Sequence, residues 1–167
     1  MRGRQLHQYT ETELYTKMSS QCAMAEYCIS DVRQKMRKLG ADEGCIDRVT
    51  KRLVKEGFID EARYAIAFVR DKFRYNRWGR VRIAQELRLK GIMQTLIDEA
   101  LNEISDEDYE TALVSLIRKK QPSVKGQNDY EVKVKLMRFA ISRGFEMDIV
   151  RKVVDVELSV SDGIDDQ

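Results

Sequence analysis

The chain has 167 residues, of which 43% are hydrophobic and 35% are charged, and its formal net charge is +2. It is apolar enough to fold and more charged than the roughly 25% typical of soluble domains, which favours amphipathic helices with much exposed surface. One proline and nine glycines are too few for the turns of a β-sandwich or barrel, so the composition predicts an all-α fold.

Three copies of one helical unit follow one another along the chain. In each copy a helix ends at a glycine, Gly40, Gly91 or Gly144, and successive glycines are 51 and 53 residues apart. Apolar residues recur eight and four positions before each glycine and six and nine positions after it, spacings that place them on one face of a helix. A glycine directly after a helix is typical of its C-terminus. We therefore expect a helix, a short turn and a second helix in every copy.

A longer helix precedes this pair in each unit, with apolar residues three and four positions apart. These stripes are Leu14, Met18, Cys22 and Ala25, then Ala62, Ile66, Val69 and Phe73, then Tyr109, Ala112, Leu116 and Ile117. Residues able to cap a helix start are, in chain order, Thr10 with Glu13, Ser30, Asp60, Ser105, and Asn128 with Glu131. Pro122 marks the one long loop.

The predicted architecture is therefore three tandem three-helix modules, about nine helices in all. The modules span residues 10–57, 58–104 and 105–158, and an aperiodic acidic tail at 159–167 is expected to be flexible. A module of roughly 50 residues has a small core, so neighbouring modules should lean on one another and form an elongated, curved array. No sustained heptad seam is present, so we expect a monomer.

Positive charge is concentrated in the middle of the chain, where residues 70–90 hold eight Lys or Arg against two acidic residues. Arginines alternate there with aromatic residues, which suits phosphates and stacked bases or an acidic protein surface. The alternative is a solvated basic turn in which Trp78 covers a module junction. The candidate partner-binding residues, including a basic extension in the third unit, are Arg70, Lys72, Arg74, Arg77, Trp78, Arg80, Arg82, Arg88, Lys90, Lys133, Lys135, Arg138 and Arg143.

Two further features of this segment need an explanation. Arg80 and Arg82 stand at a predicted helix start, where the macrodipole disfavours cations, which suggests that an anion binds among the free amides. On the same helix Ile83, Ala84 and Leu87 point inward, whereas Val81 and Leu89 point outward, either against the adjacent module or into a partner interface. Glu86 lies one turn from Arg82 and Lys90 and is expected to form surface ion pairs with them.

Several chemistries lack support. Cys22, Cys28 and Cys45 show no CxxC spacing and are expected to pack as reduced thiols, and His7 is the single histidine. The stretch 129–133 fits the D-x-E-x-K pattern of metal nucleases, but it continues a helical stripe rather than a strand. No phosphate-binding glycine loop and no long apolar run or signal-peptide core is present. We expect a cytoplasmic binding protein with no catalytic residues, no metal and no cofactor.

The middle unit resembles the RecX regulatory family. Gly57–Ala65 reads GFIDEARYA, and Gly79–Ile92 reads GRVRIAQELRLKGI, which match the family's G-[FY]-[IL]-[DN]-[DE] stretch and its basic stretch ending in K-G-I. Trp78 departs from the pattern, since a small or basic residue is expected there. The resemblance covers roughly residues 20–155, is specific in the middle unit and is weaker at both ends.

This resemblance implies three three-helix modules lodged in the groove of the RecA filament on single-stranded DNA, where they hamper its recombinase, ATPase and co-protease activities in DNA repair and the SOS response. The alternative is a DNA-binding protein that acts without RecA, because a three-helix unit with a glycine between its last two helices is similar to a helix-turn-helix. Salt separates the two, since DNA binding alone weakens steeply as salt rises.

Overall fold

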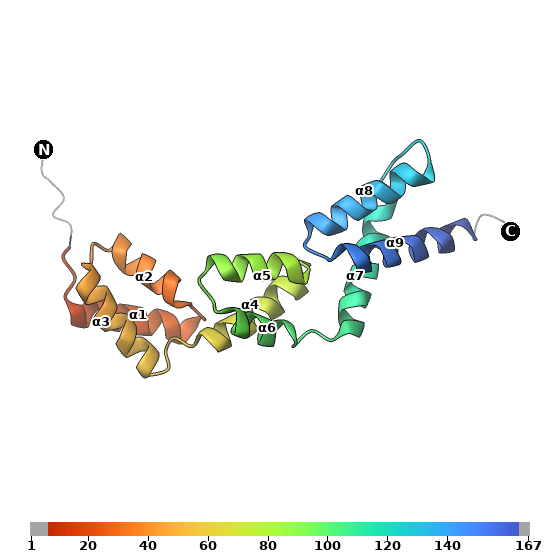
Figure 1. The fold of residues 1–167 in the computed structure, drawn as a ribbon. Helices are drawn as coiled ribbons and strands as arrows, with labels where there is room; N and C mark the ends of the chain where they lie inside the picture. The colour runs from red at the N-terminus through yellow and green to blue at the C-terminus, as the bar shows by residue number, and fades with distance from the viewer. Residues whose placement is uncertain (1–6, 164–167) are drawn as a thin grey trace, which may run out of the picture.

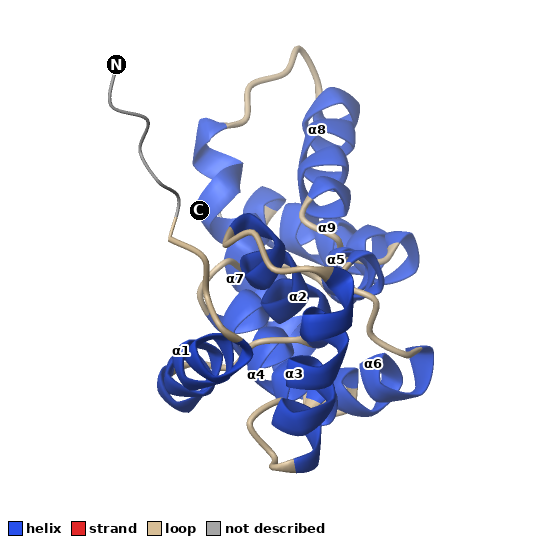
Figure 2. Cartoon of the chain, turned by 90° about the vertical axis from the view of Figure 1, so that its left-hand side faces the viewer, coloured by secondary structure: helices blue, strands red, loops and turns tan. Residues whose placement is uncertain are grey.

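A computed structural model describes residues 7–163, and in this range the chain is helical with no strand, as Figure 2 shows. The all-α prediction is confirmed. The first module contains α1 (Glu11–Met24), α2 (Ile29–Lys38) and α3 (Glu43–Lys55). The second contains α4 (Glu61–Arg74), α5 (Arg80–Leu89) and α6 (Gln94–Leu101). The third contains α7 (Asp106–Lys120), a 3-10 turn η1 (Gln121–Ser123), α8 (Asp129–Ser142) and α9 (Met147–Asp162).

The helices pack in threes: in the described chain, each extensive helix–helix contact joins two helices of the same module. The three modules follow one another in an elongated, curved array (Figure 1). The second helix of each module, α2, α5 or α8, lies along the same edge of this array. The predicted architecture of tandem three-helix modules is therefore confirmed, and it creates one long edge built from equivalent helices.

The inward-facing residues predicted from the glycine spacing are buried. Ile83 and Leu87 of α5, like Val32 and Met36 of α2, are almost fully shielded from solvent. Gly40, Gly91 and Gly144 all have positive φ angles, the conformation that ends a helix at low cost only for glycine. The helical spacing of apolar residues and one glycine at the turn thus explain why each of these helix pairs forms.

The buried residues form two clusters rather than three. One cluster comprises the core of the first module together with Ile59 at the start of the second, and the other runs continuously through the second and third modules. Cys28 is the one residue from the first module in the larger cluster. The second and third modules therefore share a hydrophobic core, and the first has a core of its own.

Most predicted helix caps are confirmed. The side chains of Thr10, Asp60, Ser105 and Asn128 each accept a hydrogen bond from an amide in the first turn of their helix. The prediction for Ser30 is wrong. Ser30 lies inside α2, and its hydroxyl donates to the carbonyl of Lys90, 2.9 Å away, because that carbonyl ends a helix of the neighbouring module.

The chain end and the cysteines complete the fold. Helix α9 continues to Asp162, so the prediction of a flexible tail is wrong for residues 159–162, which are helical; residues 164–167 of the predicted tail lie outside the described range. The three cysteines are free and buried, as expected, and burial raises the pKa of each thiol. Within residues 7–163 no helix is both long and apolar enough to span a bilayer.

Candidate partner-binding surface

The turn between α4 and α5 is fixed against the third module by its backbone. The amide of Gly79 donates to the carbonyl of Arg143 over 2.8 Å, and the amide of Val81 donates to the carbonyl of Gly144 over 2.9 Å. The approach is so close that a Cβ on Gly79 would lie 2.3 Å from the backbone of Gly144. This contact, which we call the second junction, holds the basic turn in one position.

Arg80 has a structural role at the second junction. Its guanidinium pairs with Asp106 over 3.0 Å and lies 4.0 Å from the centre of the Tyr109 ring. Its backbone amide donates to the Tyr109 hydroxyl oxygen over 3.0 Å. The Tyr109 hydroxyl in turn donates to Glu146 over 2.5 Å. Burial, reinforced by the bond to Glu146, raises the pKa of Tyr109, so the hydroxyl remains protonated at neutral pH.

These contacts correct the interpretation of the α5 N-terminus. The amides of Gly79, Arg80 and Val81 are occupied by groups from the third module, and the anion beside Arg80 is the chain's own Asp106. An external anion was predicted because the spacing of residues within one module does not show that the next module provides the carboxylate. A signal was present, because residues 91–117 hold seven Asp or Glu and no Lys or Arg, directly after the most basic segment.

Lys90 likewise has an internal partner. Its ammonium pairs with Asp31 of α2 over 2.7 Å, which together with the Ser30 hydrogen bond forms the first junction, between the first and second modules. Arg63 adds an ion pair to Glu26 over 2.5 Å. Burial, the largest single influence, raises the pKa of Asp31, but the hydrogen bonds from Lys90 and Cys28 and the charge of Lys90 together outweigh it and hold this pKa below its ordinary value. Glu86, expected to pair with Arg82 and Lys90, forms no ion pair with any described residue.

A cationic and aromatic group remains at the turn, which we call the Trp78 cluster: Lys72, Arg77, Trp78, Arg82 and Arg143. The ammonium of Lys72 lies 4.9 Å from the centre of the indole, and the guanidinium of Arg82 lies 4.1 Å from it. Arg143 reaches the same turn through the carbonyl of Asn76, 3.5 Å away. Arg77 adopts a positive φ of 54°, which is strained for a residue other than glycine.

The four cations of the Trp78 cluster form no ion pair with a carboxylate in the described part of the chain. Like charges gathered at one place raise the local positive potential and favour an anionic partner. Exposed and half-buried arginines beside an aromatic ring are also frequent at protein interfaces. Arg80 and Lys90 are engaged in ion pairs at the two junctions, whereas the four cations of the Trp78 cluster are available to an anionic partner.

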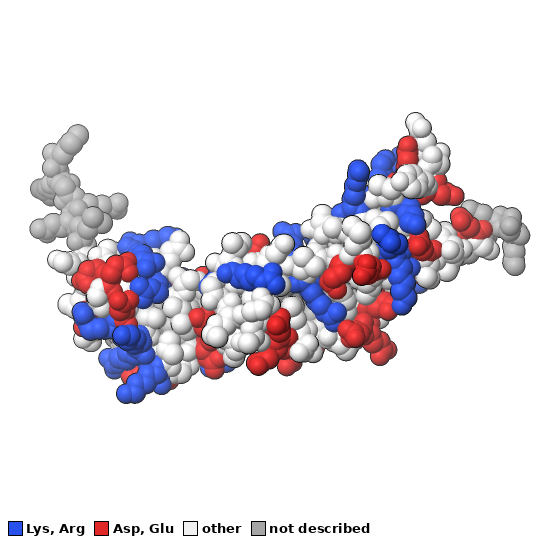
Figure 3. Space-filling view, viewed as in Figure 1, with Lys and Arg blue, Asp and Glu red and all other residues white. Residues whose placement is uncertain are grey.

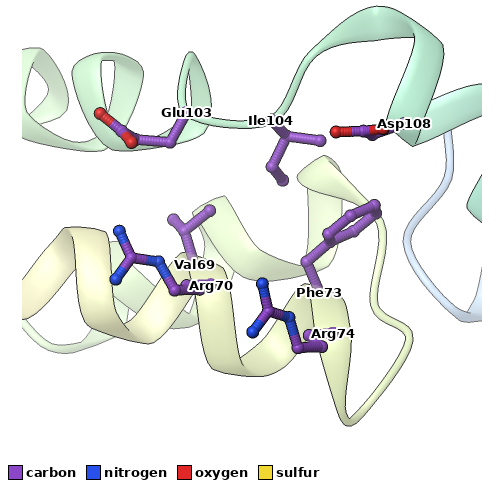
Figure 4. Close-up of a pocket in the computed structure, with 7 residues that line it drawn as sticks. All are labelled: Val69, Arg70, Phe73, Arg74, Glu103, Ile104 and Asp108. Carbon is purple, nitrogen blue, oxygen red and sulfur yellow. The ribbon is translucent and has the colours of Figure 1, made fainter.

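Arg70 and Arg74 face a different surface. They line one side of a cavity of about 320 Å³ over Val69, Phe73 and Ile104, opposite Glu103 and Asp108 (Figure 4). Neither arginine pairs with a carboxylate among the described residues. The thirteen predicted residues therefore do not form one continuous site.

The remaining basic candidates lie along α5 and α8. Arg88 donates to Gln94 over 2.8 Å, Lys133 pairs with Asp155 over 2.6 Å, and Lys135 donates to the carbonyl of Lys125 over 2.5 Å. Arg138 is exposed and forms no ion pair with a described residue. On the face in Figure 3, Lys and Arg side chains gather over α5 and around α8, with acidic groups between them.

The D-x-E-x-K stretch lies in α8, as the helical stripe predicted. Glu131 accepts from the amide of Gln127, and Lys133 points to Asp155 of α9, so these side chains stabilise the helix and its packing. In the described part of the chain, no three His, Cys, Asp or Glu side chains are arranged to hold a metal ion.

Family models and known proteins resemble this chain in both sequence and fold. Residues 60–101 match the second three-helix domain of RecX, and residues 106–154 match the third. The chain is 33% identical over 130 residues to the "Regulatory protein RecX" of Chlorobium phaeobacteroides (strain BS1), covering 78% of this chain and 83% of that protein. It is 34% identical over 125 residues to the protein of that name from Clostridium botulinum (strain Eklund 17B / Type B), covering 74% of this chain.

The chain spans only 58% of the length of the Clostridium botulinum protein. Among solved structures, the crystal structure of RecX from Lactobacillus salivarius superimposes with a TM-score of 0.78 at 21% identity, over 90% of this chain and 97% of that one. A second, titled "Crystal structure of regulatory protein RecX", gives a TM-score of 0.80 at 23% identity, over 87% and 71% of the two chains. At these identities the structures establish the shared fold.

Proposed function

Since the chain belongs to the RecX family of regulatory proteins, we propose that it binds, as a monomer, the filament that RecA forms on single-stranded DNA. There it inhibits the filament's ATPase, recombinase and co-protease activities and carries out no chemistry of its own. The observation that carries this proposal is the Trp78 cluster, whose four cations lack internal carboxylate partners in the described chain. An elongated body suits a filament groove because it can contact successive protomers.

Within this proposal the basic residues have distinct roles. Arg80 and Lys90 set the positions of neighbouring modules through Asp106 and Asp31. The Trp78 cluster contacts carboxylates of RecA or phosphates of the DNA, both of which arginine binds well. Arg88 and Arg138, farther along the same edge, extend the contact to a neighbouring protomer.

The test adds the purified chain to RecA assembled on single-stranded DNA with ATP and follows ATP hydrolysis. We expect stoichiometric inhibition by the natural chain and at least about tenfold weaker inhibition by the double variant Arg77→Asn, Arg82→Gln, because loss of interfacial arginines often costs this much. Gln keeps the Arg82 stem beside Gly144, and Asn tolerates the positive φ at position 77.

The matched control is Lys51→Gln, Lys55→Gln, which removes the same charge from exposed positions of α3. Equal weakening by both double variants would reduce the effect to net charge and remove the cluster from the proposal. Undiminished hydrolysis with the natural chain would refute RecA inhibition altogether. Tight binding to bare DNA, lost steeply with salt, would then favour the DNA-binding alternative.

A further inference from the structure

The outward face of α5 carries aliphatic side chains that neither the core nor a neighbouring module covers. Leu89 is 80% exposed and Val81 is 43% exposed, although Ile83, Ala84 and Leu87 of the same helix are buried. Val81, Gln85 and Leu89 are four residues apart, so they follow one another along one side of the helix. Packing against the adjacent module therefore does not explain Leu89.

The third module carries a further exposed aliphatic side chain across the second junction. The amide of Val81 donates to the carbonyl of Gly144, whose own amide donates to the carbonyl of Ile141. Ile141 of α8 is 37% exposed, so two exposed aliphatic side chains lie on either side of the second junction. We call the set Val81, Leu89 and Ile141 the α5–α8 stripe. Both helices lie on the edge of the array that Figure 1 shows.

The charges beside the α5–α8 stripe are mostly positive. Arg82 and Arg88 flank it on α5, and Arg138 lies one turn before Ile141 on α8. The single carboxylate of α5, Glu86, lies three residues before Leu89 and four after Arg82, so it is one acidic neighbour of the stripe among three arginines. Arg82 also belongs to the Trp78 cluster, so the stripe and the cluster are neighbours.

We propose that the α5–α8 stripe docks an amphipathic, acidic segment of the protein partner, which places aliphatic side chains on Leu89 and Val81 and carboxylates on Arg82, Arg88 and Arg138. The chemistry selects protein over nucleic acid, because a phosphate backbone gains nothing from an exposed leucine, whereas an apolar anchor ringed by charged groups is typical of protein interfaces. The inference rests on the proposed function and names RecA itself, rather than its DNA, as what this edge contacts.

The experiment measures the concentration of this chain that half-inhibits ATP hydrolysis by RecA on single-stranded DNA. Leu89→Asp introduces a carboxylate into the stripe and is expected to raise that concentration at least about tenfold, the scale of an interface hot spot. Leu89→Arg is expected to raise it as well, because the apolar contact is lost. The control Met24→Asp places the same charge on α1, outside the stripe, at an 89% exposed position and is expected to have no effect.

Both positions are exposed, and thermal unfolding of each of the three variants confirms that the fold is retained. If the natural chain inhibits and Leu89→Asp inhibits as well as Met24→Asp does, the docking inference is refuted while the proposed function stands. Stronger inhibition by Leu89→Arg than by the natural chain also refutes it, since a polyanion would then be the ligand of this edge. If the natural chain does not inhibit, the proposed function fails and the assignment to RecA fails with it.

Discussion

The two junctions of the array are built from different parts of the chain. Backbone hydrogen bonds from Gly79 and Val81 cross the second junction, and the rings of Phe73, Tyr109 and Phe145 stack beneath them. Among the described residues, the first junction is crossed by backbone hydrogen bonds only at the chain connection itself, where the amides of Phe58 and Ile59 donate to the carbonyl of Leu53. It depends on side chains, chiefly the ion pair of Lys90 with Asp31.

The cores show the same difference. The second and third modules share one hydrophobic cluster, to which the first module contributes a single side chain, Cys28. Stability in an array of repeats is a sum of module and interface terms, and here the two interface terms are unequal. We therefore interpret the second and third modules as one rigid unit that carries the Trp78 cluster, and the first module as a more weakly attached arm.

The largest expected effect breaks the second junction. A Cβ at Gly144 would lie 2.3 Å from the Cβ of Arg82, and the residue has a φ of +96°. Gly144→Ala is therefore expected to lower the free energy of unfolding by about 3 kcal/mol, from left-handed backbone strain together with overpacking. Urea unfolding measures the change.

Gly40→Ala is the matched control for backbone strain. Gly40 ends the equivalent helix of the first module with a φ of +85°, but no atom lies within 4 Å of the Cβ it would gain. The strain alone is expected to cost about 1 kcal/mol. If both variants lose the same stability, the close approach at the second junction contributes nothing and the comparison fails.

A smaller effect sharpens the comparison at the hydroxyl of Tyr109. Tyr109→Phe leaves the amide of Arg80 and the carboxylate of Glu146 without this partner and is expected to cost about 2 kcal/mol. Tyr64, near the first junction, is also buried, but its hydroxyl faces the thiol of Cys28, which is a weak partner. Tyr64→Phe should cost under about 1 kcal/mol. Thermal unfolding of both variants distinguishes them, and a reversed order would contradict the difference between junctions.

The sequence was sufficient for the features that depend on neighbouring residues. Ile83 and Leu87 are buried and Leu89 is exposed, as helical periodicity predicts. The side chains of Asp60 and Ser105 cap their helices because the side-chain oxygen of each accepts a hydrogen bond from the backbone amide three residues later. In each case the deciding interactions lie within about one turn of helix, so spacing determines the outcome.

The partners of the charged residues were not predictable in the same way. Lys90 pairs with Asp31 rather than with Glu86 one turn away, because Asp31 is half-buried at the first junction, where a cationic partner offsets its desolvation. Arg80 pairs with Asp106 of another module. The ion-pair partners of Lys90 and Arg80 depend on how neighbouring modules pack, which cannot be predicted from residue spacing within one helix. The candidate site was consequently predicted as thirteen residues, although the structure gives two of them junction roles.

The first junction predicts a pH dependence of stability. The pKa of Asp31 is below its ordinary value in the folded chain, so its ion pair adds stability above the unfolded pKa and loses it as the pH falls through the folded one. Asp31→Asn should cost about 1 kcal/mol at neutral pH, a typical value for a partly exposed pair. The gap between variant and natural chain should close as the pH falls below about 4. Thermal unfolding from pH 7 to pH 3 tests this, and a constant gap would exclude the ion pair as its cause.

The smallest expected effect has the opposite sign and lies in the turn that leads into the second junction. Arg77 has a φ of 54°, a conformation that costs a residue with a Cβ about 1 kcal/mol or more. Glycine adopts this φ without that strain, and the extra entropy that glycine loses on folding costs somewhat less than the strain it removes. Arg77→Gly is therefore expected to raise the free energy of unfolding by about 0.5 kcal/mol. The same variant should inhibit RecA less, because it removes a cation of the Trp78 cluster. Strain kept at the expense of stability is consistent with a binding residue. A variant that is both less stable and fully inhibitory would instead make Arg77 a structural part of the second junction.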